Sequence, residues 1–335
     1  HRAHKDFSLS GAAGAVLAPV GQDQPLAQRR REHGLAVFDL ELLTARLDRD
    51  AVHVAKMAPM KKLLIAGYGD IARRAAPRLE ARYVLQALSR RRGFDLDRPE
   101  TLAGLAAADA VLHCAPPPAS GTADTHTCNL LAALAKGGIL PARVVYVSTS
   151  GVYGDCGGAR VDESRAVHPQ TDRARRRVDA ERQLALWCSE RGVALVVLRA
   201  PGIYAADRLP LERLRLGTPV LRTEDDVYTN HIHAEDLAAI VVRALEDAAP
   251  GGTYNGSDDS EIRMGDWLDL VAERAGLPRP PRVARSEVQG RIAPELLSFM
   301  SESRRLANRR MKEGLGARLR YRTVFEGVPR PAEAA

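Results

Sequence analysis

Short apolar runs alternate with longer amphipathic stretches from residue 60 onward. The apolar runs have the length of buried strands, which the pattern predicts at residues 63–66, 83–88, 110–114, 144–147 and 194–198. The stretches between them have helical character and predict helices at residues 71–81, 99–107, 124–136 and 174–191. Strands that alternate with helices in this way form βαβ units, so the sequence predicts an α/β fold with a doubly wound parallel sheet.

This rhythm divides the chain into three predicted parts. Residues 1–59 do not follow it and are predicted to be an N-terminal extension, poorly ordered, wrapped on the surface or non-native; the alternative is a small helical element that contributes to an interface. Residues 60–200 are predicted to be the Rossmann core. Residues 201–330 are turn-rich, and we expect them to form a small C-terminal substrate-binding part, interleaved with the core, above the carboxyl edge of the sheet, where ligands bind in such folds.

The charge balance narrows the class of partner. The net charge is +7, but aromatic residues make up only 4% of the chain, which disfavours a surface that stacks nucleic-acid bases. Residues 302–312 are predicted to be a basic helix, on which four arginines make a charged face: Arg304, Arg305, Arg309 and Arg310. We expect a solvated or salt-bridged face there, no nucleic-acid partner, and an anionic or sugar-like small molecule as the substrate.

Cysteine usage and hydropathy indicate the compartment. The four cysteines form no CxxC motif and their spacing suits no zinc site, so we expect reduced thiols and a cytoplasmic protein. No apolar run approaches the roughly 18 residues that a membrane span needs. His231 and His233 lie two apart and, with Glu235 and Asp236 nearby, could make a metal site, but a strand that enters a helix is favoured and no metal is predicted.

A glycine turn follows the first predicted strand and opens the first predicted helix. Its residues fit the pattern G-x-G-x-x-G/A: Gly67, Tyr68, Gly69, Asp70, Ile71 and Ala72. Gly67 permits the tight turn, and Gly69 lacks the Cβ that would block a pyrophosphate. The amides and the positive dipole end of the helix would then hold the phosphates. In this strand–turn–helix context the motif predicts a dinucleotide site.

The cofactor ribose is usually bound at the end of the second strand, about 20 residues later. An acidic residue there would bind the 2′-hydroxyl of NAD, but the sequence has Ser89, Arg90 and Arg91. Arginine suits a 2′-phosphate, because it forms charge-assisted and often bidentate hydrogen bonds. We therefore expect NADP in preference to NAD, the alternative being a solvated arginine run on a loop.

Several longer segments over residues 61–325 resemble the extended short-chain dehydrogenase/reductases, of the NAD-dependent epimerase/dehydratase type. The segments are GFDLDRPETL, AVLHCAPPP, VVYVSTSGVYGD, VLRAPGIYAADRLP and NHIHAEDLAAIVVRAL. The resemblance implies that Asp95 and Leu96 contact the adenine. It also places four residues beside the cofactor, namely Cys114, Ala115, Pro116 and, in the segment that passes the nicotinamide, Pro201. A homodimer is plausible by this resemblance.

The same resemblance implies the catalytic positions. Thr149, three residues before Val152-Tyr153-Gly154, matches the hydroxyl that orients the substrate oxygen. Anchoring the Tyr-x-x-x-Lys motif on Glu181 places Arg173 at the Tyr position and Arg177 at the Lys position. Arginine cannot give up a proton, so Arg173 could stabilise an oxyanion or pin an anion but not protonate it. The proton would come from Tyr153, Tyr204, His168, Asp155 or water.

Two functions follow from this pattern. The first is an NAD(P)-dependent oxidoreductase or epimerase-like enzyme, with hydride transfer to or from a carbonyl or alcohol carbon and without the usual Tyr-Lys pair. The second is a non-catalytic NAD(P)H-binding sensor or regulatory protein. Arg177 could still hold the nicotinamide ribose in either of them.

Overall fold

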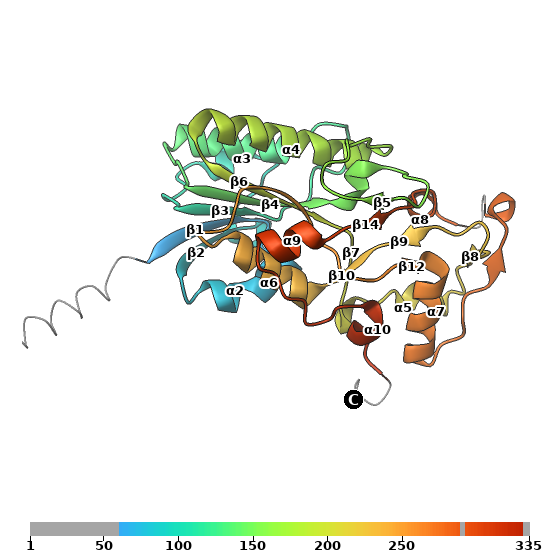
Figure 1. Cartoon of the computed structure of the whole chain (residues 1–335). Helices are drawn as coiled ribbons and strands as arrows, with labels where there is room; N and C mark the ends of the chain where they lie inside the picture. Colours follow the sequence, from blue (N-terminus) through green and yellow to red (C-terminus); the bar gives the residue numbers. More distant parts are fainter. Residues whose placement is uncertain (1–59, 289–291, 331–335) are drawn as a thin grey trace, which may run out of the picture. The chain divides into compact units, whose positions relative to one another are not determined.

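A computed structural model describes residues 60–288 and 292–330, so the predicted extension at 1–59 lies outside the described residues. Six strands form one parallel sheet, in the order β11-β6-β4-β3-β1-β2 (Figure 1). Along the chain they are β1 (Lys61–Ala66), β2 (Tyr83–Leu88), β3 (Ala110–His113), β4 (Arg143–Thr149), β6 (Ala194–Ala200) and β11 (Gly252–Asn255). The predicted doubly wound α/β fold is thus confirmed, with β11 as a strand that the pattern did not predict.

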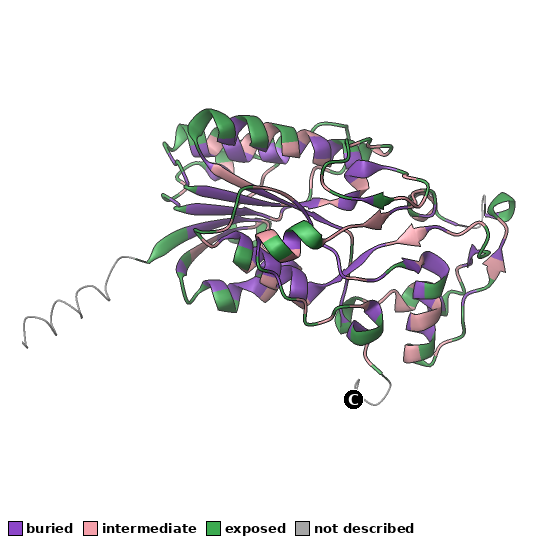
Figure 2. Ribbon diagram, viewed as in Figure 1, coloured by how far each residue is buried: buried purple, intermediate pink, exposed green. Residues whose placement is uncertain are grey.

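Two pairs of helices cover the two faces of the sheet (Figure 1). The pair α3 (Thr125–Lys136) and α4 (Asp172–Arg191) packs on one face, and the pair α2 (Asp70–Leu79) and α6 (Ala234–Ala244) packs on the other. The central strands are buried on both sides, which is why they read as continuous apolar runs (Figure 2). Asp124 caps α3 by accepting from the Thr127 amide, and Thr171 caps α4 by accepting from the Ala174 amide.

The direction of the chain across the sheet changes between β1 and β3. From β1 the chain moves outward to β2 and then returns to β3 on the other side of β1. In parallel sheets this reversal leaves a crevice at the carboxyl ends of the two strands. Gly67 follows β1 and Cys114 follows β3, and both residues line cavities at that edge.

Most of the rest of the chain builds short elements beyond this edge (Figure 1). Four two-stranded pairs form: β7 (Gly202–Tyr204) with β10 (His231–His233), β8 (Val220–Leu221) with β13 (Arg282–Val283), β9 (Tyr228–Thr229) with β12 (Ile262–Arg263), and β5 (Arg160–Val161) with β14 (Arg305–Leu306). The helices are α5 (Leu211–Arg215), α7 (Met264–Ala275), α8 (Pro294–Phe299), α9 (Arg309–Gly314) and α10 (Val324–Gly327). A separate apolar cluster, with Trp267 among its members, holds several of these elements together.

Two helix predictions were wrong in their extent. The stretch at 99–107 contains only a 3-10 turn, Pro99–Leu102, because Ala103 is extended and Gly104 adopts a φ of +79°. Residues 302–312 are not one basic helix. Arg305–Leu306 pairs with Arg160–Val161 as a strand, and α9 begins only at Arg309.

The four arginines of that segment therefore share no helical face. Arg304 is buried, and its Nη1 donates to the Gly154 carbonyl oxygen at 2.6 Å. Among the helices of residues 60–288 and 292–330, none combines the length and apolarity needed to cross a membrane.

Candidate functional site

Three adjoining cavities lie along the carboxyl edge of the sheet. The turn cavity, of about 250 Å³, lies over the glycine turn, and the central cavity, of about 260 Å³, lies over the start of α2. The outer cavity, of about 550 Å³, extends toward the C-terminal part. Gly69 and Cys114 line both the turn and central cavities, whereas Thr149 and Arg177 line both the central and outer cavities. The three cavities therefore form a series along one edge.

The two glycines of the turn are required for different reasons. Gly67 has a φ of +87°, and a Cβ there would lie 2.4 Å from the Ala115 backbone nitrogen, so packing of the protein itself demands glycine. Gly69, the N-cap of α2, has an ordinary φ of −88°, and a Cβ there would meet no atom within 4 Å. Glycine at 69 thus leaves open space above a helix start, as a bound phosphate group requires.

The turn cavity collects most of the predicted cofactor residues. Its lining includes Gly67, Tyr68, Gly69, Ser89, Arg90, Asp95, Leu96, Cys114, Ala115 and Pro116. The Arg90 side chain is 74% exposed and only loosely paired, with its Nε 3.7 Å from Asp95 Oδ1. Its guanidinium is therefore available to an anion at the mouth of the cavity. Arg91 is exposed and is the one predicted cofactor residue that lines none of the three cavities.

His126 lines the turn cavity and was not singled out from the sequence. Its Nδ1 lies 2.8 Å from the Pro116 carbonyl oxygen, and its Nε2 lies 2.7 Å from Asp97 Oδ1. These contacts join the start of α3 to the loops after β2 and β3. No short motif marks a histidine in this position, because both of its partners come from other parts of the chain.

The central cavity holds Asp70, Ile71, Thr149, Arg177 and Pro201. The Asp70 carboxylate accepts from Arg74 at 3.0 Å and from Arg208 at 2.7 Å, so both of its oxygens are paired, although Arg74 also pairs with Asp207 and Glu235. Cys114 also lines the cavity, and burial raises the pKa of its thiol to about 12, which keeps it protonated. Among the described residues that line the cavity, no carboxylate is unpaired and no thiolate is present to repel a phosphate.

Arg177 reaches this cavity from α4 and is held by three acceptors. Its Nη1 donates to the Tyr146 hydroxyl at 2.9 Å, and it also approaches the carbonyl oxygens of Val147 at 3.3 Å and Ala115 at 3.4 Å. These contacts fix the guanidinium at the wall between the central and outer cavities.

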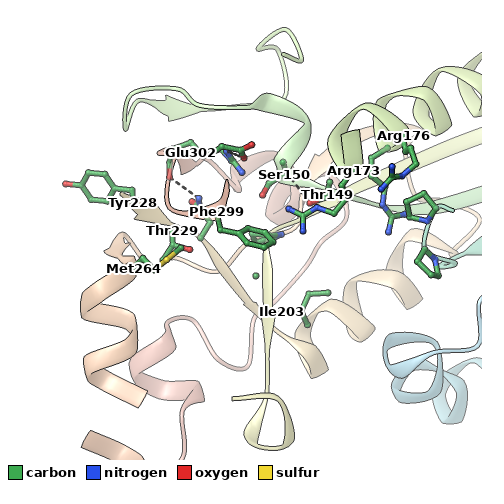
Figure 3. A pocket seen from close by; sticks show the side chains of 18 of the residues that line it. Thr149, Ser150, Arg173, Arg176, Ile203, Tyr228, Thr229, Met264, Phe299 and Glu302 are labelled. Atoms are coloured by element: carbon green, nitrogen blue, oxygen red, sulfur yellow. Dashed lines mark hydrogen bonds and ion pairs between the residues drawn. The ribbon is translucent and has the colours of Figure 1, made fainter. Parts of the chain in front are cut away.

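The outer cavity contains Thr149 and Arg173, which come from β4 and α4. The Oγ1 atom of Thr149 accepts from the Gly151 amide at 3.2 Å, which leaves its proton free to donate elsewhere. In Figure 3 the Arg173 guanidinium points from α4 toward Phe299, whose ring centroid lies 4.2 Å from Arg173 Cζ. Burial lowers the pKa of Arg173, but an arginine remains charged.

The side chains proposed from the sequence as proton donors do not line these cavities. The Tyr153 hydroxyl is buried and donates to Asn255 Oδ1 at 2.9 Å, and burial raises its pKa. The Tyr204 hydroxyl donates to the Thr323 carbonyl oxygen at 3.3 Å, and burial raises its pKa as well. Asp155 accepts from the Ser303 amide at 2.8 Å, and His168 is exposed. The geometry therefore gives Tyr153 a structural role and argues against it as a proton donor.

His231 and His233, which are two apart in the sequence, have separate structural roles. His233 caps α6 by accepting from the Glu235 amide at 3.2 Å, and the ring of His231 packs 4.4 Å from that of Trp267, between centroids. In the described part of the chain no group of three His, Cys, Asp or Glu side chains is arranged to hold a metal ion.

A protein-family model described as "NAD dependent epimerase/dehydratase family" matches residues 63–255. Among solved structures, a functionally unknown conserved protein from Silicibacter pomeroyi is 29% identical, with a TM-score of 0.67 over 80% of this chain and 97% of its own. Two others share the fold. RMD from Pseudomonas aeruginosa, complexed with NADPH, is 19% identical with a TM-score of 0.63, over 82% of this chain and 99% of its own. The UDP-glucose 4-epimerase from Thermotoga maritima is 18% identical with a TM-score of 0.63, over 82% and 97%.

Among curated proteins, none matches the sequence. The family match covers the glycine turn, β4 and α4, and so contains all the described residues that line the central cavity. It confirms the predicted resemblance and, since the family is NAD dependent, the prediction of NAD or NADP as the cofactor. This chain belongs to the NAD-dependent epimerase/dehydratase family.

Proposed function

We propose that the protein is an NADP-dependent oxidoreductase or epimerase-like enzyme that interconverts a carbonyl and an alcohol carbon of a small molecule. One observation carries the proposal: Thr149 and Arg177 line both the central cavity beside the glycine turn and the outer cavity beyond it. A cofactor laid along the turn and central cavities would therefore end where a small molecule in the outer cavity begins.

The residues of the turn and central cavities fit a nicotinamide dinucleotide. Gly69 and the start of α2 would hold the pyrophosphate, and Asp95 and Leu96, which line the turn cavity, would contact the adenosine. The exposed Arg90 supports the preference for a 2′-phosphate, hence for NADP. The guanidinium of Arg177, held by Tyr146, would bind the nicotinamide ribose. A bound nicotinamide would supply the hydride acceptor or donor.

The chain's own residues then orient the reacting oxygen. The Thr149 hydroxyl donates to a carbonyl oxygen, and the positive charge of Arg173 stabilises the oxyanion that develops in the transition state. Neither Arg173 nor Arg177 can supply the proton. Since the tyrosines considered from the sequence are buried elsewhere, we propose that water in the open outer cavity supplies it.

A second function, a non-catalytic NAD(P)H sensor, is favoured by one feature. By their spacing from Glu181 we assign Arg173 and Arg177 to the Tyr and Lys positions of the family, and an arginine cannot give and take a proton near neutral pH as the usual tyrosine does. A sensor would keep the turn and central cavities and lose turnover. A cytoplasmic location and a homodimer remain predictions in both cases.

Two measurements distinguish the enzyme from the sensor. Titration with NADPH, followed by fluorescence and by thermal unfolding, tests the cofactor site; we expect NADPH to stabilise the protein more than NADH does. Incubation with NADPH and a panel of aldehydes, ketones, oxo acids and nucleotide sugars then tests turnover. Binding without any turnover would support the sensor, and no binding of either nucleotide would contradict both functions.

A further inference from the structure

The arginines that line the outer cavity outnumber the acidic side chains that line it. Five arginines line it, namely Arg173, Arg176, Arg177, Arg208 and Arg304, and Glu302 is the only acidic residue of the described chain that does so. Glu302 pairs with Arg304 at 2.9 Å, and Arg208 pairs with Asp70 at 2.7 Å. Within the described residues, no ion pair is formed by the other three arginines, all of which come from α4.

Two of the five arginines also have unused donors inside the protein. Arg176 is 7% exposed and Arg304 is 9% exposed, and the Nε–H group of each is buried without a hydrogen-bond partner. Buried guanidinium donors are normally satisfied, because leaving them unpaired is costly. An anion in the cavity would neutralise part of the excess charge and could bind the remaining N–H groups of these guanidinium groups.

Arg173 is held in the cavity without a direct ion pair among the described residues, although the Glu302 carboxylate is near enough to favour its charge. Its guanidinium lies over the Phe299 ring, with 4.2 Å between Cζ and the ring centroid. Desolvation opposes its positive charge most, and the charges of Arg177, Arg176 and Arg304 oppose it further, whereas the Glu302 carboxylate favours it; the net effect lowers the pKa of Arg173. A planar, partly desolvated cation that is stacked on an aromatic ring is well prepared to bind a carboxylate or a phosphate.

The positive charge of the three α4 arginines lies close to the proposed reaction centre. Arg173, Arg176 and Arg177 lie at i, i+3 and i+4 on α4, hence on one side of the helix. Arg173 and Arg177 line the same cavity as Thr149, the residue proposed to orient the reacting oxygen. The positive charge is thus beside the proposed reaction centre and not at a remote end of the substrate.

We propose that the substrate carries a carboxylate or phosphate close to its reacting carbonyl or alcohol carbon, and that Arg173 and Arg176 bind this anionic group. The inference rests on the proposed function for the place of the reacting carbon, but anion binding can be measured by itself. A small oxo acid, hydroxy acid or phosphorylated carbonyl compound has the required chemistry, whereas an uncharged ketone would leave the arginines unpaired.

The test uses the full chain, saturated with NADPH, at constant ionic strength set with chloride. Oxalate and inorganic phosphate serve as probes, and calorimetry gives their dissociation constants; the tighter probe tells carboxylate from phosphate. Arg173→Met keeps an apolar contact with Phe299 and should weaken the tighter probe at least about tenfold. Arg175→Ala is the matched control, because Arg175 lies on the same helix, pairs with Asp172 at 2.6 Å and lines none of the three cavities.

The outcomes are distinct. Saturable binding of one probe that Arg173→Met weakens and Arg175→Ala preserves supports the inference. If neither probe binds, or if Arg173→Met binds as tightly as the wild type, the inference is overturned, while the proposed function stands as long as NADPH binds. If NADPH itself does not bind, the proposed function fails, and titration of the nucleotide-free protein still decides whether the anion site exists.

Discussion

Arg177 Nη1 donates a hydrogen bond to the Tyr146 hydroxyl over 2.9 Å, and this contact joins α4 to the sheet directly beside the central cavity. Tyr146 is fully buried, and burial raises its pKa to about 12, so its hydroxyl stays protonated and accepts from the arginine. The Arg177 guanidinium is thereby held in place by the protein's own groups.

This contact leads to a prediction about cofactor affinity. Arg177→Ala should weaken NADPH binding about tenfold or more, because it removes a fixed charge-assisted donor. Tyr146→Phe keeps the guanidinium and loses one internal hydrogen bond. It should therefore lower the free energy of unfolding by about 1 kcal/mol and affect NADPH binding less. Calorimetric titration of both variants checks the prediction, and an unchanged dissociation constant in Arg177→Ala would remove the ribose-binding role.

The two glycines of the turn should respond differently to the same substitution. Gly69→Ala should fold with a loss of at most about 1 kcal/mol, since its Cβ meets only open space, yet it should weaken NADPH binding at least about tenfold because that space is the phosphate site. Gly67→Ala should lose about 2 kcal/mol or more of unfolding free energy, because φ is +87° and the Cβ meets the Ala115 backbone at 2.4 Å.

Urea unfolding and NADPH titration of both glycine variants separate these two effects. A Gly69→Ala protein that binds NADPH like the wild type would show that no phosphate approaches this turn. Unchanged stability in Gly67→Ala would show instead that β1 and the Ala115 loop can move apart at little cost.

Arg90 should decide between the two nucleotides. Arg90→Ala should weaken NADPH binding about tenfold and leave NADH binding unchanged, because only NADPH carries the 2′-phosphate that the guanidinium would bind. Arg98→Ala is the control, since Arg98 pairs with the same carboxylate, that of Asp95 at 3.6 Å, but does not line the turn cavity. Equal losses for NADPH and NADH would mean that Arg90 has no part in nucleotide preference.

The turn and the sheet could be predicted from the sequence because their signals are local. Apolar runs of strand length and the glycine spacing between residues 67 and 72 each depend on neighbours in the chain. The prediction of a helix at 99–107 was wrong because Gly104, with a φ of +79°, ends the helical turn. The prediction of a helix at 302–312 was wrong because Arg305–Leu306 pairs with a strand far away in the chain, Arg160–Val161.

The outer cavity was harder to predict because its residues also come from distant parts of the chain. Phe299 and Glu302 line the same cavity as Arg173 and Thr149 only because of the tertiary fold, and neither residue belongs to a motif. His126 depends likewise on a carbonyl and a carboxylate from other loops. The sequence could assign candidate residues to individual strands and helices. The contact between Arg173 and the Phe299 ring could be found only in the folded chain.

A last prediction concerns stability against pH and rests on Asp258. This side chain is buried, its Oδ1 accepts from the Ser260 amide at 2.9 Å, and its Oδ2 has no hydrogen-bond partner. Burial, with smaller contributions from Asp259 and Asp236, raises its pKa from 3.8 to about 7. In this range the folded state binds a proton that the unfolded chain has released, so this carboxyl makes the free energy of unfolding fall as pH rises toward 7.

Asp258→Asn cannot ionise and should remove this dependence. The variant should gain stability relative to the wild type as pH rises from 4 to 8, with an upper bound of about 4 kcal/mol set by the difference between 3.8 and about 7. Burial lowers the pKa of His113 and of His231 to about 3, which costs stability in acid, but both are present in the two proteins and cancel in the difference. Urea unfolding at pH 4, 5, 6, 7 and 8 measures it, and a constant difference would mean that Asp258 ionises alike in the folded and unfolded chain.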